Sequence, residues 1–115
     1  MQDKLELSLL LDYYGAFLTD NRRELLGLSV NEDLSLGEIA ELKRISRQGV
    51  RDALMHGERQ LYDMENKLGL VARDAEIVGL LTQLRNEMSL RGIENKQIEL
   101  ILSRLEEITE GENGI

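Results

Sequence analysis

The sequence predicts an all-α protein, with a helix-turn-helix head followed by a long helix and a C-terminal helical hairpin. Three observations favour this fold class. The 115 residues include no Pro, apolar residues recur at steps of three and four along most of the chain, and two helix-start signals stand close together at Ser35 and Ser46. No segment shows the apolar and polar alternation typical of a strand.

Two helices are expected before these signals, over residues 3–18 and 20–30. Thr19 and Asp20 resemble the cap of the second helix, which ends at the polar residues 31–33. The first helix carries an apolar stripe that we expect to face inward, formed by Leu7, Leu10, Leu11, Tyr14, Phe17 and Leu18. Its aromatic residues Tyr13, Tyr14 and Phe17 could stack on bases, but their spacing favours core packing.

The third helix has the clearest start in the sequence. Ser35 and Glu38 fit a capping box, and the flanking Leu34 and Ile39 fit a hydrophobic staple. A short helix over residues 36–43 should follow. Small Ala40 lets a neighbouring helix cross closely, because a larger side chain would separate the two helices.

The next start signal predicts a fourth helix of about 22 residues. Ser46 is its cap, Ile45 and Val50 are the staple pair, and Gly69 supplies the stop. Ile45 is expected to fill the turn, while Val50 and Leu54 anchor the helix from beneath. The apolar seam alternates steps of four and three through Val50, Leu54, Gly57, Leu61, Met64 and Leu68.

Two further helical patterns cover residues 73–90 and 94–109, with a bend at Gly92. Their apolar positions are Ile77, Leu80, Leu81, Leu84, Met88, Ile98, Ile101, Leu102, Leu105 and Ile108. We expect one domain over residues 1–115, with residues 12–70 as the head and long helix, 71–109 as the hairpin and 110–115 as a frayed tail. The apolar faces of the hairpin could cover the head or pair with a second copy.

Charge is distributed unevenly along the chain. The net charge is −8, yet residues 43–51, KRISRQGVR, hold four cations and no anion. Lys43, Arg44 and Arg47 lie near the positive end of a helix dipole, which is unfavourable by roughly 0.3–1 kcal/mol per charge without an anion nearby. The pattern therefore predicts an anionic ligand at this helix start.

A helix-turn-helix with these charges suits duplex DNA. Arg44 and Arg47 would grip backbone phosphate, while Gln48, Arg51 and Asp52 would face base edges in the major groove. Gln48 would suit adenine and Arg51 guanine. The alternative is a solvated polar face whose side chains pair within the helix.

Other chemistries find little support in the composition. The absence of Cys and the single His56 exclude disulfides, thiolate catalysis and multi-histidine metal centres. No phosphate loop or nucleophile motif occurs, so we expect no enzyme and no cofactor. His56 is expected to be merely exposed, and the acids Glu106, Glu107, Glu110 and Glu112 are expected to form a solvated face rather than a metal site. No membrane span or signal peptide is indicated, which predicts a cytoplasmic protein.

Four segments make the sequence familiar: DYYGAFLTD (residues 12–20), DLSLGEIAE (33–41), ISRQGVRD (45–52) and YDMENKLGL (62–70). The chain resembles the YlxM family of signal-recognition-particle-associated proteins, which are similar to region 4 of sigma factors. The resemblance implies an all-helical, dimeric, DNA-binding-like protein, linked to the targeting particle only through neighbouring genes.

By position, the resemblance implies a recognition-helix surface made of Ser46, Arg47, Gln48, Arg51 and Asp52, with Ser35 as a phosphate contact. The chain departs from the family pattern in three places. Lys43 and Arg44 replace an apolar residue followed by Gly, Leu28 and Ser29 replace an aromatic pair, and Gly49 weakens the fourth helix. At Arg44, either the turn is rebuilt or an unfavourable backbone conformation is kept.

Two functions follow. The first is a DNA-binding regulatory protein, acting as a homodimer with two recognition helices roughly 34 Å apart on a palindromic site. The second is a factor that binds RNA or protein of the signal recognition particle without reading DNA sequence. Overall acidity supports the second.

Overall fold

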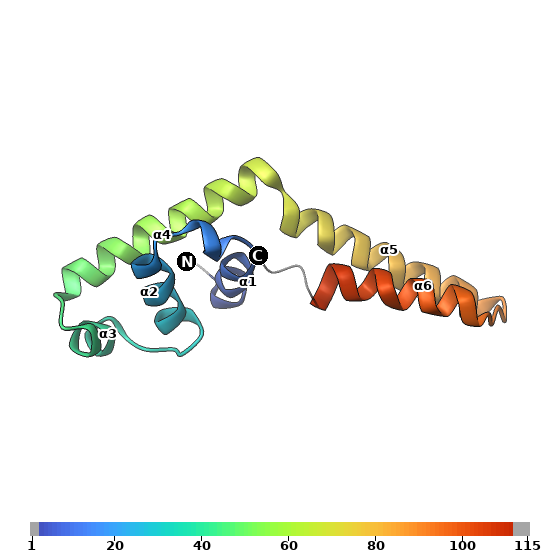
Figure 1. The fold of residues 1–115 in the computed structure, drawn as a ribbon, viewed down its shortest axis with the longest axis horizontal. Coiled ribbons are helices and arrows are strands. Elements are labelled where there is room, and N and C mark those ends of the chain that lie inside the picture. Colours follow the sequence, from blue (N-terminus) through green and yellow to red (C-terminus); the bar gives the residue numbers. More distant parts are fainter. Residues whose placement is uncertain (1–2, 112–115) are drawn as a thin grey trace. The chain divides into compact units, whose positions relative to one another are not determined.

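The computed structural model describes residues 3–111, and the chain divides after Gly69 into two compact units. We call residues 3–69 the head and residues 70–111 the hairpin, and we describe each separately. The described residues form six α-helices and no strand (Figure 1). The predicted all-α fold class is therefore confirmed.

The head contains four α-helices, each with a side-chain cap at its start. They are α1 (Lys4–Tyr14), α2 (Asp20–Val30), α3 (Leu36–Lys43) and α4 (Arg47–Leu68). The caps are Asp3, Thr19, Ser35 and Ser46, whose side-chain oxygens each accept a backbone N–H of the first turn. The predicted bounds of α2, α3 and α4 are confirmed.

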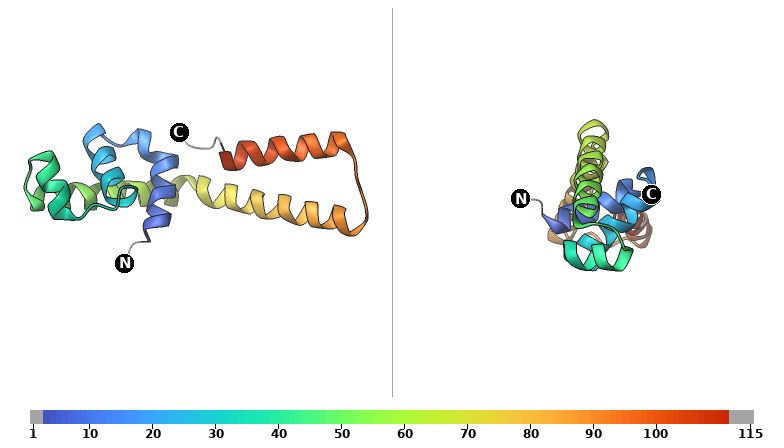
Figure 2. Two further views of the ribbon diagram at one scale, coloured as in Figure 1. Left: turned by 90° about the horizontal axis from the view of Figure 1, so that it is seen from below. Right: turned by 90° about the vertical axis from the view of Figure 1, so that its left-hand side faces the viewer.

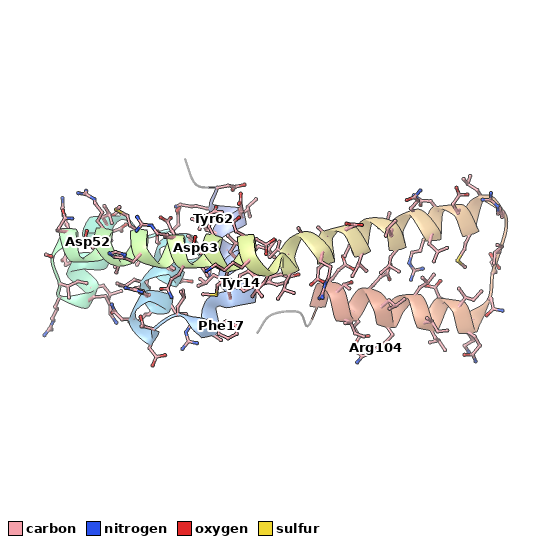
Figure 3. All side chains as sticks on the ribbon, turned by 90° about the horizontal axis from the view of Figure 1, so that it is seen from above. Tyr14, Phe17, Asp52, Tyr62, Asp63 and Arg104 are labelled. Atoms are coloured by element: carbon pink, nitrogen blue, oxygen red, sulfur yellow. The ribbon has the colours of Figure 1, made fainter. Side chains whose placement is uncertain are left out.

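The first helix is shorter than expected. After Tyr14 the chain tightens into a 3-10 turn, η1 (Gly15–Phe17), closed by a hydrogen bond from the Leu18 N–H to the Gly15 carbonyl. A 3-10 turn advances fewer residues per turn than an α-helix, so Phe17 rotates off the apolar stripe. Phe17 is 60% exposed and lies clear of α4 (Figure 3), so its prediction as core is wrong, whereas Tyr13 and Tyr14 are buried as expected.

Helix α4 is the central helix of the head, because α1, α2 and α3 all pack against it (Figure 2). Its buried positions are Val50, Gly57 and Leu61. Around its first turns, a core cluster joins three helices through Leu25, Ile39, Ala40 and Val50. The predicted seam of α4 is thus confirmed at its centre, while Leu68 at its end is 58% exposed.

A buried tyrosine ties α1 to the second half of α4. Tyr14 is fully buried, and its hydroxyl donates a 2.6 Å hydrogen bond to Oε1 of Glu65. Arg22 of α2 donates a second bond of 2.6 Å to Oε1 of Gln60. These bonds keep α4 in register with α1 and α2.

The hairpin consists of α5 (Leu70–Leu90), α6 (Lys96–Glu106) and a π-helical turn, η2 (Glu107–Gly111). Gly92 takes φ 65° at the bend, as expected of the glycine there. Helix α5 begins three residues before the expected Arg73, because Gly69 alone interrupts the helical run at φ 63°. Helix α6 begins after the expected Glu94, because the side chain of Asn95 caps it by accepting the Ile98 N–H.

Burial within the hairpin is less than the pattern suggested. Of the predicted apolar positions only Leu81 and Leu102 are buried, since two helices offer each other one narrow face each. Glu110 and Gly111 belong to η2, whereas the rest of the predicted tail lies outside the described residues. None of the described helices is long and apolar enough to span a bilayer.

A glycine on α4 tests the packing of the head. A Cβ built at Gly57 would lie 2.7 Å from Cδ1 of Leu26, which is itself 1% exposed. Gly57→Ala should therefore destabilise the protein by about 1 kcal/mol, although Ala normally favours a helix over Gly. Urea unfolding followed by circular dichroism measures this.

The matched control is Gly27→Ala in α2, where an added Cβ meets nothing within 4 Å. This change should stabilise the protein by up to about 1 kcal/mol. Equal effects of the two substitutions would contradict the close approach of α2 to α4.

Candidate nucleic-acid interface

Helices α3 and α4 are joined by a tight turn of Arg44, Ile45 and Ser46. The Arg44 N–H donates to the carbonyls of Ala40 and Glu41, and the Ile45 N–H donates to the Ala40 carbonyl at 3.1 Å. These bonds satisfy the end of α3 and start α4 at once. Because Ile39 and Ala40 face Val50 across this turn, the two helices cross in contact, as predicted.

Arg44 holds the turn in the left-handed conformation, with φ 57° and ψ 45°. The turn is therefore not rebuilt around the missing glycine. A non-glycine residue in this conformation costs roughly 1–2 kcal/mol relative to its ordinary one. The head thus carries a strained, exposed cation where glycine would be easier.

Ile45 does not fill the turn, because it is 42% exposed. Leu34, Leu36 and Leu54 instead pack against the core cluster. With the cluster already closed by these leucines, Ile45 is left at the surface, and its prediction as a plug is wrong.

Arg47 lies over the start of α3. A Cβ built at Gly37 would lie 3.0 Å from Nη2 of Arg47, so the guanidinium occupies the space that a side chain there would take. Gly37 was not among the expected site residues. The only signal for it in the sequence is a glycine in the first turn of a short helix, just after the cap Ser35.

Gln48 and Asp52 pair with each other on the exposed side of α4. Nε2 of Gln48 donates a 2.8 Å hydrogen bond to Oδ1 of Asp52, one turn later. The intrahelical pairing considered as an alternative therefore holds for these two residues. It leaves Oε1 of Gln48 as the acceptor that faces outward.

The arginines of the interface behave differently. Arg44, Arg47 and Arg51 are exposed, and none of them forms an ion pair with another residue of the described part of the chain. Lys43 is half buried and pairs with Glu24 of α2. Three of the four cations predicted here thus keep their charge available to a ligand.

The two serines serve first as helix caps. The hydroxyl oxygen of Ser35 accepts the Glu38 N–H at 3.1 Å, and that of Ser46 accepts the Gly49 N–H at 2.9 Å. In return the Glu38 carboxylate accepts the Ser35 N–H at 2.8 Å, and this backbone bond, together with a hydrogen bond from the Ser35 hydroxyl, lowers the pKa of the Glu38 carboxyl. The Ser35 hydroxyl thus donates its hydrogen to the Glu38 carboxylate, whereas the hydroxyl hydrogen of Ser46 stays available for an acceptor such as phosphate.

The remaining residues singled out in the sequence lie elsewhere. His56 is exposed, as expected. In the hairpin, Glu106 pairs with Arg85 and Glu107 with Arg104, while Glu112 lies outside the described residues. No group of three or more metal-ligating side chains occurs within residues 3–111.

An all-α head with crossed α3 and α4, and with exposed cations at the start of α4, defines a helix-turn-helix protein. Comparison with known families agrees with this class. The family UPF0122, described as "Putative helix-turn-helix protein, YlxM / p13 like", matches residues 1–101. The chain belongs to this family, and the resemblance seen in the sequence is confirmed.

Relatives match over most of their length. A UPF0122 protein of Thermoanaerobacter sp. (strain X514) is 44% identical over 106 residues, covering 92% of this chain and 90% of the relative. One from Acetivibrio thermocellus is 41% identical over 109 residues, covering 93% of each. One from Clostridium perfringens (strain 13 / Type A) is 34% identical over 109 residues, covering 94% of this chain and 97% of the relative.

The strained turn gives a direct test. Arg44→Gly should stabilise the protein by about 1 kcal/mol, because glycine adopts the left-handed conformation without the Cβ penalty. Arg44→Ala removes the same charge but keeps the Cβ, so it should show no such gain. The urea midpoints of the two variants decide, and equal midpoints would argue against backbone strain at this position.

Proposed function

We propose that the head binds duplex DNA, with the first turns of α4 in the major groove. The observation that carries the proposal is the set of exposed arginines without ion pairs, Arg44, Arg47 and Arg51, at a helix start that the core cluster holds rigidly. Unneutralised cations at the positive end of a helix dipole favour a polyanion.

Each residue has a place in this proposal. Arg44 and Arg47, with the Ser46 hydroxyl, would bind backbone phosphates on either side of the turn. Arg51 would bind guanine through its O6 and N7 atoms. Because Gln48 donates to Asp52, its outward acceptor and the Asp52 carboxylate would accept from base amino groups, such as those of adenine or cytosine.

We further propose that the protein acts as a homodimer with a regulatory role. One head presents a single recognition helix and few phosphate contacts. Two heads, spaced about one DNA turn or roughly 34 Å apart, would read a palindromic site. Such pairing doubles the number of contacts without enlarging either interface.

Two arginines separate phosphate contact from base reading. Arg47→Ala should weaken binding by the same factor for every DNA sequence, because it removes a phosphate contact. It should also reduce the slope of log affinity against log salt concentration by about one. Arg51→Ala should relax preference at one base position and lower affinity there roughly 5- to 150-fold. Selection from random duplexes, followed by titrations of the selected site, measures both effects.

The control is Arg104→Ala, which removes one exposed cation from α6 of the hairpin. It should leave both affinity and base preference unchanged. If wild type, Arg47→Ala and Arg51→Ala bind DNA equally, the proposed interface is wrong.

A second candidate function is binding to RNA or protein of the signal recognition particle. The observation that favours a protein of the particle is the acidity outside the interface: residues 1–33 carry seven acids against three bases, and residues 61–115 carry eleven against six. This charge opposes a long polyanion that extends beyond the small cationic surface.

Titrations at two salt concentrations distinguish the candidates. We expect duplex DNA to bind, with an affinity that falls steeply as salt rises. Binding of the particle's RNA or protein, with no binding of duplex DNA at the lower salt, would favour the second candidate instead.

A further inference from the structure

An apolar face runs along one side of the hairpin. Six large aliphatic side chains on α5 and α6 remain well exposed there. They are Leu80 (57%), Leu84 (46%), Ile98 (38%), Ile101 (60%), Leu105 (41%) and Ile108 (47%).

Helix geometry gives the sides of the hairpin. The contact between α5 and α6 passes through the buried Leu81 and Leu102. On an α-helix, the residue three positions later lies on one flank of such a line, and the residue four positions later lies on the other. These flanking positions are Leu84 and Arg85 in α5, and Leu105 and Glu106 in α6.

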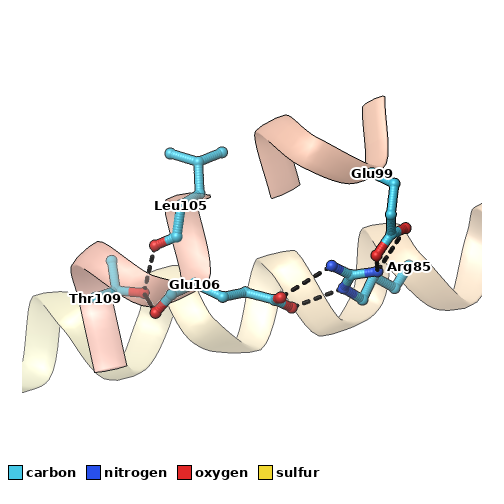
Figure 4. A network of polar contacts seen from close by, with 5 residues as sticks. All are labelled: Arg85, Glu99, Leu105, Glu106 and Thr109. Atoms are coloured by element: carbon cyan, nitrogen blue, oxygen red, sulfur yellow. Dashed lines mark hydrogen bonds and ion pairs between the residues drawn. The ribbon is translucent and has the colours of Figure 1, made fainter. Parts of the chain in front are cut away.

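The ion pairs show which flanks face the same way. Nε and Nη2 of Arg85 donate to Glu106 at 2.7 and 2.9 Å, and its Nη1 donates to Glu99 at 2.7 Å (Figure 4). One side of the hairpin is therefore ionic. Leu84 and Leu105, on the other two flanks, must share the opposite side, which is the apolar face.

The spacing along α6 matches that of a helix with two partners. Ile98, Ile101, Leu105 and Ile108 follow one another at steps of three, four and three residues. This repeat is the seam of coiled coils and four-helix bundles. Leu102 faces α5, whereas the side chains of the seam remain exposed and have no apolar partner within the hairpin.

The hairpin is too small to be stable with its own interior alone. Its only buried large apolar side chains within residues 70–111 are Leu81 and Leu102, and the chain has no Cys for a disulfide. Units of about 40 residues usually need a disulfide, a metal or association with another chain. Association through the apolar face would bury further apolar surface, and a second copy is present wherever the chain is made.

We propose that the apolar face packs against the same face of a second copy across a two-fold axis, forming a four-helix bundle. An isologous contact uses the same face on both copies, so residues i and j of one copy meet residues j and i of the other. The six side chains of the face are uncharged and create no like-charge repulsion there. The Arg85 ion pairs stay on the outer side. The inference assigns a surface to the homodimer of the proposed function, yet it does not require that the head bind DNA.

The dimensions suit a stable dimer. Helix α5 has 21 residues and is therefore about 30 Å long, and two packed helices are about 20 Å wide. The whole side of the hairpin that carries the apolar face therefore has a footprint on the order of 600 Å² per copy. Two copies together would bury more than about 1,000 Å², which is the size expected of a specific interface.

Sedimentation equilibrium of the full chain tests the proposal. Wild type should sediment at twice the chain mass of 13.1 kDa. Ile101→Glu places a charge in the face, so it should raise the dimer dissociation constant at least a hundredfold and give the monomer mass. The matched control is Leu100→Glu, since Leu100 is 57% exposed, close to the 60% of Ile101, but lies on the far side of α6. It should remain a dimer.

Crosslinking gives a second readout that does not depend on a disruptive charge. Because the chain has no Cys, Ile101→Cys or Leu100→Cys introduces one thiol per copy. A short bifunctional maleimide should link two copies through Cys at the first position far more than at the second. Equal crosslinking of both variants would overturn the proposed surface.

A monomeric wild type would also overturn it, showing that the face is covered by the head of the same chain or by another protein. That result would leave the effect of Arg47→Ala on DNA binding untouched. A dimer whose heads ignore DNA would conversely support the surface and reject the proposed function.

Discussion

The contact of α3 with the first turns of α4, made through the fully buried Ile39 and Val50, is the constraint on which the rest of the head depends. Ala40 lets the helices approach, and the caps Ser35 and Ser46 begin each helix at a defined residue. A cap exchanged for Ala costs only about 1 kcal/mol, whereas a cavity at Val50 or Ile39 would remove the support of both helices. The exposed surface of α4 is therefore set from beneath, by packing rather than by its own polar contacts.

The charges of the interface oppose this stability. Arg44 keeps a left-handed backbone at the end of α3, and Arg47 lies in the first turn of α4, near the positive end of its dipole. Lys43 is neutralised by Glu24, but the neighbouring arginines have no such partner among the described residues. Backbone strain and unneutralised charge on a rigid scaffold are typical of binding sites. Selection for stability alone would favour glycine at position 44 and an acidic residue near the arginines.

Signals within a few residues of the sequence predicted the helix bounds and the exposed positions that contacts within a few residues determine. The bounds of α2, α3 and α4 follow from caps and stops a few residues apart, and the exposure of Gln48, Arg51 and Asp52 follows from the opposite face carrying Val50 and Leu54. The failures depend on contacts across the fold. Phe17 lies outside the core because the chain tightens into a 3-10 turn at Gly15. Ile45 lies at the surface because leucines from other segments of the head cover the core cluster. The contact of Arg47 with Gly37 depends on the geometry of the whole turn, which no single spacing encodes.

The acidity of the chain and the proposed homodimer both affect the affinity for DNA in the proposed function. With a net charge of −8 per copy, repulsion acts over a Debye length of about 8–10 Å, so a duplex approaches favourably only at the few arginines of α4. In the proposed function the acids would therefore restrict the orientation of binding and keep the affinity of one head low. Joining two heads through the proposed hairpin contact would make the second contact intramolecular, which would raise affinity without adding cations. An acidic chain with a small cationic surface thus gains the most from a second copy, and its hairpin exposes an apolar face of the size that such pairing requires.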